Sequence, residues 1–395
     1  MVPKPPRRPP ASRLRLVQDA RALDAFLDAA GDAEHLAIDT EANSMHAYRE
    51  RVCLIQVSVP AGDFLLDPLA DLDLDPFLDL CEDERVIKVL HDAEFDILLL
   101  GREYGVRLAN LFDTKVAAVA LGRSQVGLAA LVEASFGVTL DKSQQRSDWG
   151  RRPLDRAQLE YAWKDTHFLL PLRERLLGEL EDAPRLVRDE VAGECARLCA
   201  LDWKRKEDPL AWRRLKGGSR LDPTQSRALE QLWRWREQEA ERRDVPPFKV
   251  LPHAAVVAIA RRSPKDRREL GQLLSGRPLD RYGDRLLAVL DKARKKGPLV
   301  VEKPKPLRGD ARRRADAARA ALERLKAWRK RQADRRPTDP SLVLNREVME
   351  RLVELDPHPA DLDELAACGL LEPWRVEAYG EAILAALHGD RAPRR

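Results

Sequence analysis

Residues 36–67 read LAIDTEANSMHAYRERVCLIQVSVPAGDFLLD, and this stretch decides the fold of the front half of the chain. It contains three short apolar runs, LAIDTE (36–41), VCLIQVSV (52–59) and DFLLD (63–67), each bounded by polar or turn residues. Runs of this length and composition are typical of β-strands. We therefore predict a three-stranded meander.

After the meander, short apolar runs alternate with helical patterns. Residues 86–90 and 108–112 are strand-like, and strands that alternate with helices are typical of βαβ units. Beyond about Leu180 no strand pattern remains, and the chain is heavy in Arg, Ala, Leu and Glu. The sequence thus predicts an α/β domain followed by an all-helical part.

The two halves of the chain differ in charge. The net charge of the 395 residues is +4, but residues 1–200 hold 25 Lys and Arg against 35 Asp and Glu, which gives −10 there and leaves +14 for residues 201–395. An acidic front suggests carboxylates gathered for metal binding, and a basic rear suggests attraction to a polyanion such as nucleic acid. Charge alone is equally consistent with solvated helices.

Composition excludes several classes of protein. No apolar run approaches the roughly 18 to 20 residues of a membrane-spanning helix, and the basic, proline-rich start lacks the apolar stretch of a secretory signal. We expect a cytoplasmic protein with a disordered arm over residues 1–13. The five cysteines show neither metal-ligand clustering nor the density of a disulfide scaffold. Cys195 and Cys199, one helical turn apart, are interpreted as small core residues.

Two linkers divide the rear half. One, over residues 204–220, is rich in charge and carries two adjacent glycines. The other, over residues 292–310, contains KKGPLVVEKPKPLRGD, whose prolines and lysines favour an extended, mobile connection.

An internal repeat relates the two segments that these linkers separate, at an offset of 93 residues. The matched pairs are Leu232 and Leu325, Trp235 and Trp328, Ala240 and Ala333, Arg242 and Arg335, Arg243 and Arg336, Pro247 and Pro340, Val250 and Val343, and Leu251 and Leu344. After a small insertion Tyr282 corresponds to Tyr379. We infer two copies of one small helical domain. Their tryptophans, Trp233, Trp235 and Trp328, fit either the domain core or stacking on single-stranded bases.

Three local patterns carry candidate chemistry. Asp39 and Glu41 stand two apart in a predicted strand, so their side chains share one face. Asp96 follows the strand and opens a helix in VIKVLHDAEFDILLL (86–100), at the strand end where α/β sheets gather ligands. Tyr161 and Asp165 lie four apart on a predicted helix and share its face. Taken singly, each pattern is equally a surface pair, a cap or a helix surface.

In this order, the patterns resemble the DEDDy class of 3′→5′ exonucleases: DTE in a first strand, HxAxxD after a fourth, and YxxxD in a late helix. FDTKVAAVAL (112–121) and SDWGRRPLDRAQLEYA (147–162) resemble the ribonuclease D subfamily, as do AWRRLKGG (211–218) and WRWREQEAERRDVPP (233–247). The resemblance covers residues 14 to about 290, and residues 311–388 resemble a second HRDC (helicase and ribonuclease D C-terminal) domain.

The resemblance implies an α/β ribonuclease H-like exonuclease domain, with a mixed sheet flanked by helices, followed by two all-helical HRDC-like domains. The implied division is given by an arm (1–13), the exonuclease domain (14–202), a linker (203–220), the first HRDC domain (221–295), a linker (296–310), the second HRDC-like domain (311–388) and a tail (389–395).

The resemblance also implies the chemistry. Asp39, Glu41, Asp96 and Asp165 would bind two divalent cations, Mg²⁺ or Mn²⁺, and Tyr161 would hold the attacking water. His91 matches the second motif, and we interpret it as a structural histidine. Residues 162–164, Ala-Trp-Lys, are bulkier than is common in the family and are expected to alter the pocket wall.

The implied substrate is the 3′ end of RNA, in transfer RNA precursors or other small stable RNAs, with nucleoside 5′-monophosphates as products. We expect a monomer that does not bind membranes, with the rear domains acting as a basic clamp on RNA. Three alternatives stay open on sequence alone. They are a DNA exonuclease with the same site, a non-catalytic nucleic-acid-binding protein and a structural adaptor.

Overall fold

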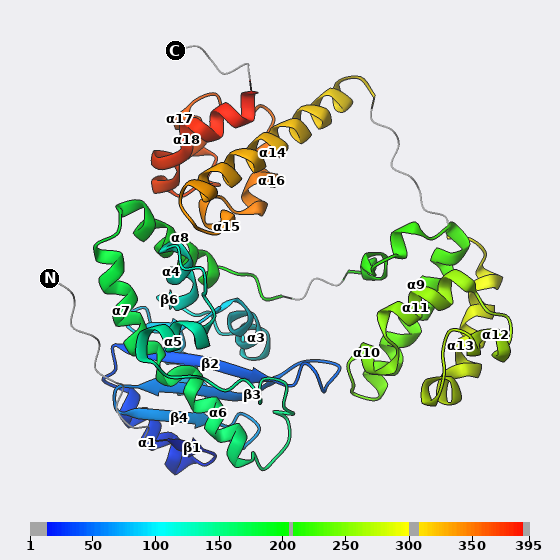
Figure 1. The fold of residues 1–395 in the computed structure, drawn as a ribbon, viewed down its shortest axis with the longest axis horizontal. Helices are drawn as coiled ribbons and strands as arrows, with labels where there is room; N and C mark the ends of the chain where they lie inside the picture. The colour runs from blue at the N-terminus through cyan, green and yellow to red at the C-terminus, as the bar shows by residue number, and fades with distance from the viewer. Residues whose placement is uncertain (1–13, 205–207, 300–307, 390–395) are drawn as a thin grey trace.

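The computed structural model describes residues 14–204, 208–299 and 308–389 (Figure 1). An α/β domain comes first. We call residues 208–299 the first helical domain and residues 308–389 the second helical domain. The predicted arm (1–13), parts of both predicted linkers, and the tail beyond Gly389 lie outside the described residues.

Six strands form one mixed sheet in the order β1-β4-β3-β2-β5-β6. They are β1 (Arg15–Val17), β2 (His35–Ala42), β3 (Val52–Val59), β4 (Gly62–Leu66), β5 (Ile87–Leu90) and β6 (Leu111–Asp113). β2, β3 and β4 pair antiparallel, which confirms the predicted meander. β5 pairs parallel to both β2 and β6, as βαβ connections require.

The edge strand β1 was not predicted. It pairs parallel with β4 over three residues. Three residues are too few for the alternation of apolar and polar side chains that identifies a strand in the sequence. The strand that carries Asp39 is therefore the second along the chain, and the strand before His91 is the fifth. The numbering of strands in the sequence prediction was wrong by one, although the order of the motifs is unaffected.

Helices cover both faces of the sheet (Figure 1). They are α1 (Ala20–Ala30), α2 (Asp75–Glu82), α3 (Glu94–Tyr104), α4 (Thr114–Ala120), α5 (Leu128–Phe136), α6 (Arg156–His167), α7 (Leu169–Glu181) and α8 (Arg185–Cys199). All eight residues of β3 are buried, because α6 covers one face of this central strand through Leu54 and Ala162. Val57, three residues after Leu54 in β3, points to the opposite face and belongs to the larger core there.

The described residues after Asp113 contain helices and no strand. The first helical domain consists of the 3-10 helices η1 (Ala211–Arg214) and η2 (Gly218–Arg220), then α9 (Pro223–Arg242), α10 (Pro247–Val250), α11 (His253–Arg262), α12 (Arg267–Gly271) and α13 (Arg277–Lys296). The second consists of α14 (Gly309–Arg335), α15 (Pro340–Val343), α16 (Arg346–Glu354), α17 (Leu362–Ala367) and α18 (Pro373–His388). Trp212, inside the interval predicted as a linker, packs into the first helical core.

The two helical domains repeat the same packing. In both, a long helix is followed by a four-residue helix and then three more helices. Trp235 meets Tyr282 edge-on with ring centroids 5.4 Å apart, and Trp328 meets Tyr379 in the same way at 5.5 Å. The tryptophans therefore belong to the two cores rather than to exposed stacking surfaces. Each core also contains the leucine, alanine, valine and tyrosine positions that the repeat relates, but not the matched arginines or prolines.

The cysteines are free thiols. Cys195 is buried in the α/β core, and Cys199 packs against the same core, as their spacing predicted. Among the described residues, no helix combines the length and the apolar character needed to cross a membrane.

Candidate active site

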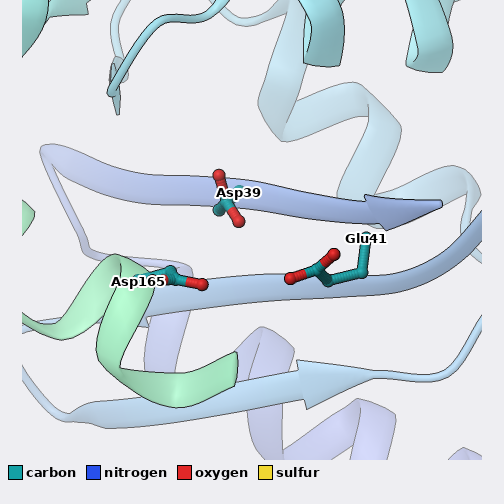
Figure 2. Close-up of side chains that lie close together, drawn as sticks. All are labelled: Asp39, Glu41 and Asp165. Carbon is teal, nitrogen blue, oxygen red and sulfur yellow. The ribbon is translucent and has the colours of Figure 1, made fainter. Parts of the chain in front are cut away.

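Two of the predicted acids lie on the part of β2 that extends beyond its pairing with β5. β5 pairs with β2 only from His35 to Ala37, whereas β3 continues beside β2 as far as Ala42. One edge of β2 is therefore open beyond Ala37. Asp39 and Glu41 lie on this free stretch, and Figure 2 shows both side chains leaving the same strand.

Helix α6 brings a third acid and a phenol to the strand. Asp155 and Gln158 form a capping box that fixes where the helix begins. Tyr161 and Asp165 follow on one face, and the Tyr161 hydroxyl partly offsets the rise in the pKa of the Asp165 carboxyl group. Figure 2 shows the Asp165 side chain extending from the helix toward the strand that bears Asp39 and Glu41.

A buried polar network anchors the last turn of α6 to the β3–β4 hairpin. The Ser58 hydroxyl lies 2.6 Å from the Asp63 carboxylate and 2.7 Å from the Thr166 hydroxyl. Nδ1 of His167 lies 2.9 Å from the same Asp63 carboxylate. These contacts hold the backbone on both sides of Thr166, and hence the neighbouring Asp165, at a fixed height above the sheet.

Three carboxylates converge, and the fourth lies beside them. One oxygen each of Asp39, Glu41 and Asp165 falls within 4.8 Å of the other two. Asp96, in the first turn of α3, accepts a hydrogen bond from the Thr40 hydroxyl. It is not part of the group of three, yet its charge is the largest electrostatic influence on the pKa of Asp39. The sequence predicted a meeting of four acids, and the structure gathers three with Asp96 held alongside by Thr40.

Burial and mutual repulsion raise the pKa of every acid in this site. The pKa of Asp39 lies well above its ordinary range, first because of burial and then because of Asp96 and Asp165. The same causes raise the pKa of Glu41 to about 9. Burial is the main reason why the pKa values of Asp96 and Asp165 rise to about 7. Acids that resist ionisation in this way are neutralised when a cation binds.

Tyr161 is a neutral phenol in this setting. Burial, followed by the negative charge of Asp165, raises its pKa above the ordinary value. Its ring packs against Trp149 with centroids 5.9 Å apart. A protonated, well-packed phenol beside the acids can orient a water molecule but cannot remove its proton at neutral pH.

His91 has a structural environment. Its Nδ1 lies 2.9 Å from the Thr114 hydroxyl, which itself donates to the Leu90 carbonyl at 3.1 Å. Burial lowers the pKa of His91 to about 4, so the ring is neutral at physiological pH. This agrees with the interpretation of His91 as a structural histidine, although the ring also lines the cavity described next.

The acids open into a cavity of about 440 Å³. Its wall also contains side chains that sequence reasoning missed, namely Ser44, Phe95, Leu140, Lys142 and Gln145. Phe95 is 45% exposed at this wall. A larger cavity of about 1160 Å³ lies between α7, α8 and β6. It is lined largely by apolar side chains and none of the acidic cluster, so the chemistry belongs to the smaller one.

Residues 162–164 do not alter the cavity wall, contrary to the sequence prediction. Tyr161 and Asp165 line the cavity, but the three residues between them do not. Ala162 is buried against the sheet, and the Trp163 ring packs edge-on against His167 at 4.8 Å. Ala162 and Trp163, one and two positions after Tyr161, lie on other faces of the helix. The Lys164 ammonium lies 5.7 Å from the centroid of the Trp163 ring.

Comparison with known families matches the domains described above. Residues 14–181 match the 3′-5′ exonuclease family, and residues 225–290 and 318–387 each match the HRDC domain.

Curated relatives and solved structures extend this similarity along the chain. Ribonuclease D of Nitrobacter hamburgensis is 32% identical over 90% of this chain and 91% of the relative. Ribonuclease D of Pseudomonas paraeruginosa is 32% identical over 89% of this chain and 92% of the relative. The crystal structure of Escherichia coli RNase D, described as an exoribonuclease involved in structured RNA processing, aligns with a TM-score of 0.64 and 26% identity over 95% of this chain and 98% of that chain. The catalytic core of RRP6 from Trypanosoma brucei also aligns, with a TM-score of 0.64 and 27% identity over 73% of this chain and 81% of that chain.

Proposed function

Since this chain belongs to the ribonuclease D family and is a 3′→5′ exoribonuclease, we propose that Asp39, Glu41, Asp96 and Asp165 form its catalytic centre together with Tyr161. The observation that carries the proposal is the convergence of three carboxylate oxygens within 4.8 Å. The DNA exonuclease, the non-catalytic protein and the adaptor considered from sequence are set aside in favour of RNA hydrolysis.

The donor set fits a hard divalent cation. The family uses divalent metal, and the converging side chains of Asp39, Glu41 and Asp165 offer carboxylate oxygens, the donors preferred by Mg²⁺ and Mn²⁺. Burial, followed by the charge of neighbouring acids, raises the pKa values of Glu41 and Asp165, so a bound cation would favour their ionised forms. We propose that Asp39, Glu41, Asp96 and Asp165 would hold two divalent ions, directly or through water. Such ions would neutralise phosphate charge and lower the pKa of a coordinated water.

The remaining steps, positioning of the water and cleavage of the phosphodiester, depend on residues of the chain. Tyr161 would hold a water molecule through its hydroxyl, and the packing of its ring on Trp149 keeps the phenol in place. Because the pKa of Tyr161 is raised, the phenol orients the water and does not act as its base. Attack of this water on the terminal phosphodiester breaks the bond to the 3′ oxygen of the preceding nucleotide. The product is a nucleoside 5′-monophosphate.

The substrate class we propose is RNA with a free 3′ end, in transfer RNA precursors or other small stable RNAs. The protein would act in the cytoplasm as a monomer. The helical domains support RNA binding unequally, since Lys and Arg number 22 against 12 Asp and Glu over residues 208–299, a net +10, and 15 against 15 over residues 308–389. The basic clamp expected of the whole rear half is thus concentrated in the first helical domain.

One experiment tests the proposal directly. Purified protein is incubated with a transfer RNA that carries a 3′ extension and with a matched DNA strand, with Mg²⁺, with Mn²⁺ or with a chelator. We expect stepwise shortening of the RNA and release of 5′-monophosphates only when a divalent ion is present. The Asp39→Asn and Asp165→Asn variants should be inactive and folded. Undiminished turnover in both would remove these residues from the catalytic centre, and equal degradation of the DNA would refute RNA selectivity.

A further inference from the structure

The second helical domain is fastened to the α/β domain through one buried carboxylate. Glu190 of α8 is fully buried, with 0% exposure, and its carboxylate accepts hydrogen bonds from the Arg336 guanidinium, at 2.5 Å to Oε1, and from the Tyr379 hydroxyl at 3.2 Å. Leu342 of α15 enters the α/β core itself. In Figure 1 the second helical domain lies directly against α8. Its Arg–Tyr pair is thus a receptor for an anionic side chain.

The first helical domain contains the same pair. Arg243 and Tyr282 are the repeat counterparts of Arg336 and Tyr379. The Arg243 guanidinium donates a hydrogen bond to the Tyr282 hydroxyl oxygen, and Tyr282 is 3% exposed against Trp235, just as Tyr379 packs against Trp328. In the described residues, no carboxylate forms an ion pair with Arg243, whereas the equivalent arginine holds Glu190.

In the contact between the first helical domain and the α/β domain, the acidic and basic partners are exchanged. The Tyr48 amide, in the connection between β2 and β3, donates to the Asp244 carboxylate at 3.1 Å. Arg49 of the same connection pairs with Glu241 at 3.1 Å. Here the helical domain supplies the acids, and among the described residues Arg243 forms no hydrogen bond or ion pair with the α/β domain. Apart from its hydrogen bond to Tyr282, the half-buried guanidinium has no acidic partner there.

Arg243 stands next in the chain to Asp244, the residue that contacts the connection between β2 and β3. The connection between β2 and β3 contributes Ser44 to the cavity wall and contacts Asp244, the neighbour of Arg243, through Tyr48. Four residues of extended chain span at most about 14 Å. A strand whose 3′ end occupies the cavity therefore reaches this contact within a few nucleotides.

We propose that Arg243 and Tyr282 bind a backbone phosphate of the substrate RNA, a few nucleotides upstream of its 3′ end, and that the second copy of this pair has instead become a clasp for Glu190. The inference rests on RNA being the substrate. Arginine and the tyrosine O–H are donors suited to an anion that only accepts hydrogen bonds, and a phosphate satisfies both. The net charge of +10 over residues 208–299, against 0 over residues 308–389, favours a polyanion at the first copy.

The test compares hydrolysis of single-stranded RNAs of about 12 and about 3 nucleotides, the shorter of which ends before the proposed contact. For Arg243→Ala we expect KM to rise about tenfold on the longer RNA, the loss typical of one charge-assisted contact, with a much smaller effect on the shorter RNA. The slope of log affinity against log salt should fall by about 0.7, the value for one phosphate on a single strand. Arg243→Lys should restore part of the affinity.

Matched variants keep the test decisive. Lys295→Ala removes one exposed charge from the same domain. It should leave KM for the longer RNA near the wild-type value. Tyr282→Phe keeps the ring on Trp235 and should raise KM by a smaller factor, so the proposal does not depend on the folding of one variant. A change for Arg243→Ala no larger than that for Lys295→Ala, or the same on both RNAs, overturns the inference. Failure of the wild-type protein to degrade RNA would instead overturn the proposed function.

Discussion

Glu41→Gln should stabilise the metal-free protein at alkaline pH while it abolishes catalysis. The pKa of Glu41 in the folded, metal-free chain is about 9, against an ordinary value near 4.5. Between these two values the unfolded chain gives up the proton and the folded chain keeps it. Stability therefore falls as pH rises through this window, at about 1.36 kcal/mol per pH unit, and the loss reaches on the order of 5 kcal/mol at pH 8. Glutamine has nearly the same size and never ionises.

The assay is thermal unfolding in the presence of a chelator at pH 5 and at pH 8. Relaxation around the acid reduces the effect, so we expect Glu41→Gln to raise the unfolding temperature of the α/β domain at pH 8 by roughly 5 to 10 °C, since 1 kcal/mol corresponds to about 2 to 4 °C in a domain of this size. The difference should nearly vanish at pH 5. Added Mn²⁺ should stabilise wild type more than the variant. A variant less stable than wild type at pH 8, or an equal difference at both pH values, would refute the electrostatic account.

The remaining predictions concern the phenol, the protons and the domain clasp. Tyr161→Phe should lower kcat by far more than it lowers affinity for Mn²⁺ in calorimetric titration, because only the water contact is lost; parallel losses would contradict its role. Since the pKa values of Asp96 and Asp165 are about 7, metal binding should release protons and strengthen from pH 6 to pH 8, which titrations in buffers of different ionisation enthalpy would measure; affinity independent of pH would count against a carboxylate site. Glu190→Ala should strip the Arg336 guanidinium of its partner and weaken the docking of the second helical domain by on the order of 3 kcal/mol. Faster hydrogen exchange in α8 and α15 would register this, and unchanged protection would disprove the clasp.

Local periodicity explains why much of the fold was predictable. The meander was readable because β3 is buried on both faces and so forms an unbroken apolar run. The repeat was readable because Trp235 and Trp328 fill the same position in two cores. β1 was missed because three residues at a sheet edge carry too little pattern to distinguish strand from loop.

The candidate site was predictable only where spacing within one element decides geometry. The i, i+2 relation in a strand placed Asp39 with Glu41, and the i, i+4 relation in a helix placed Tyr161 with Asp165. The Thr40 hydroxyl that holds Asp96 joins two elements 56 positions apart in the chain. No period in the sequence specifies such a contact, and the same holds for Lys142 and Gln145, which reach the cavity from a loop.

The burial of Glu190 bears on how this enzyme can be dissected. Removing the C-terminal residues from 309 onward would expose the Glu190 carboxylate, which is now completely buried, together with the apolar surface of the α/β domain that Leu342 covers. The truncated protein would then have a solvated carboxylate in the middle of an exposed apolar surface, which favours self-association. A loss of activity in such a fragment would reflect this exposed surface as much as the loss of an RNA contact. Single substitutions are therefore the cleaner way to assign tasks to the two ends of the molecule.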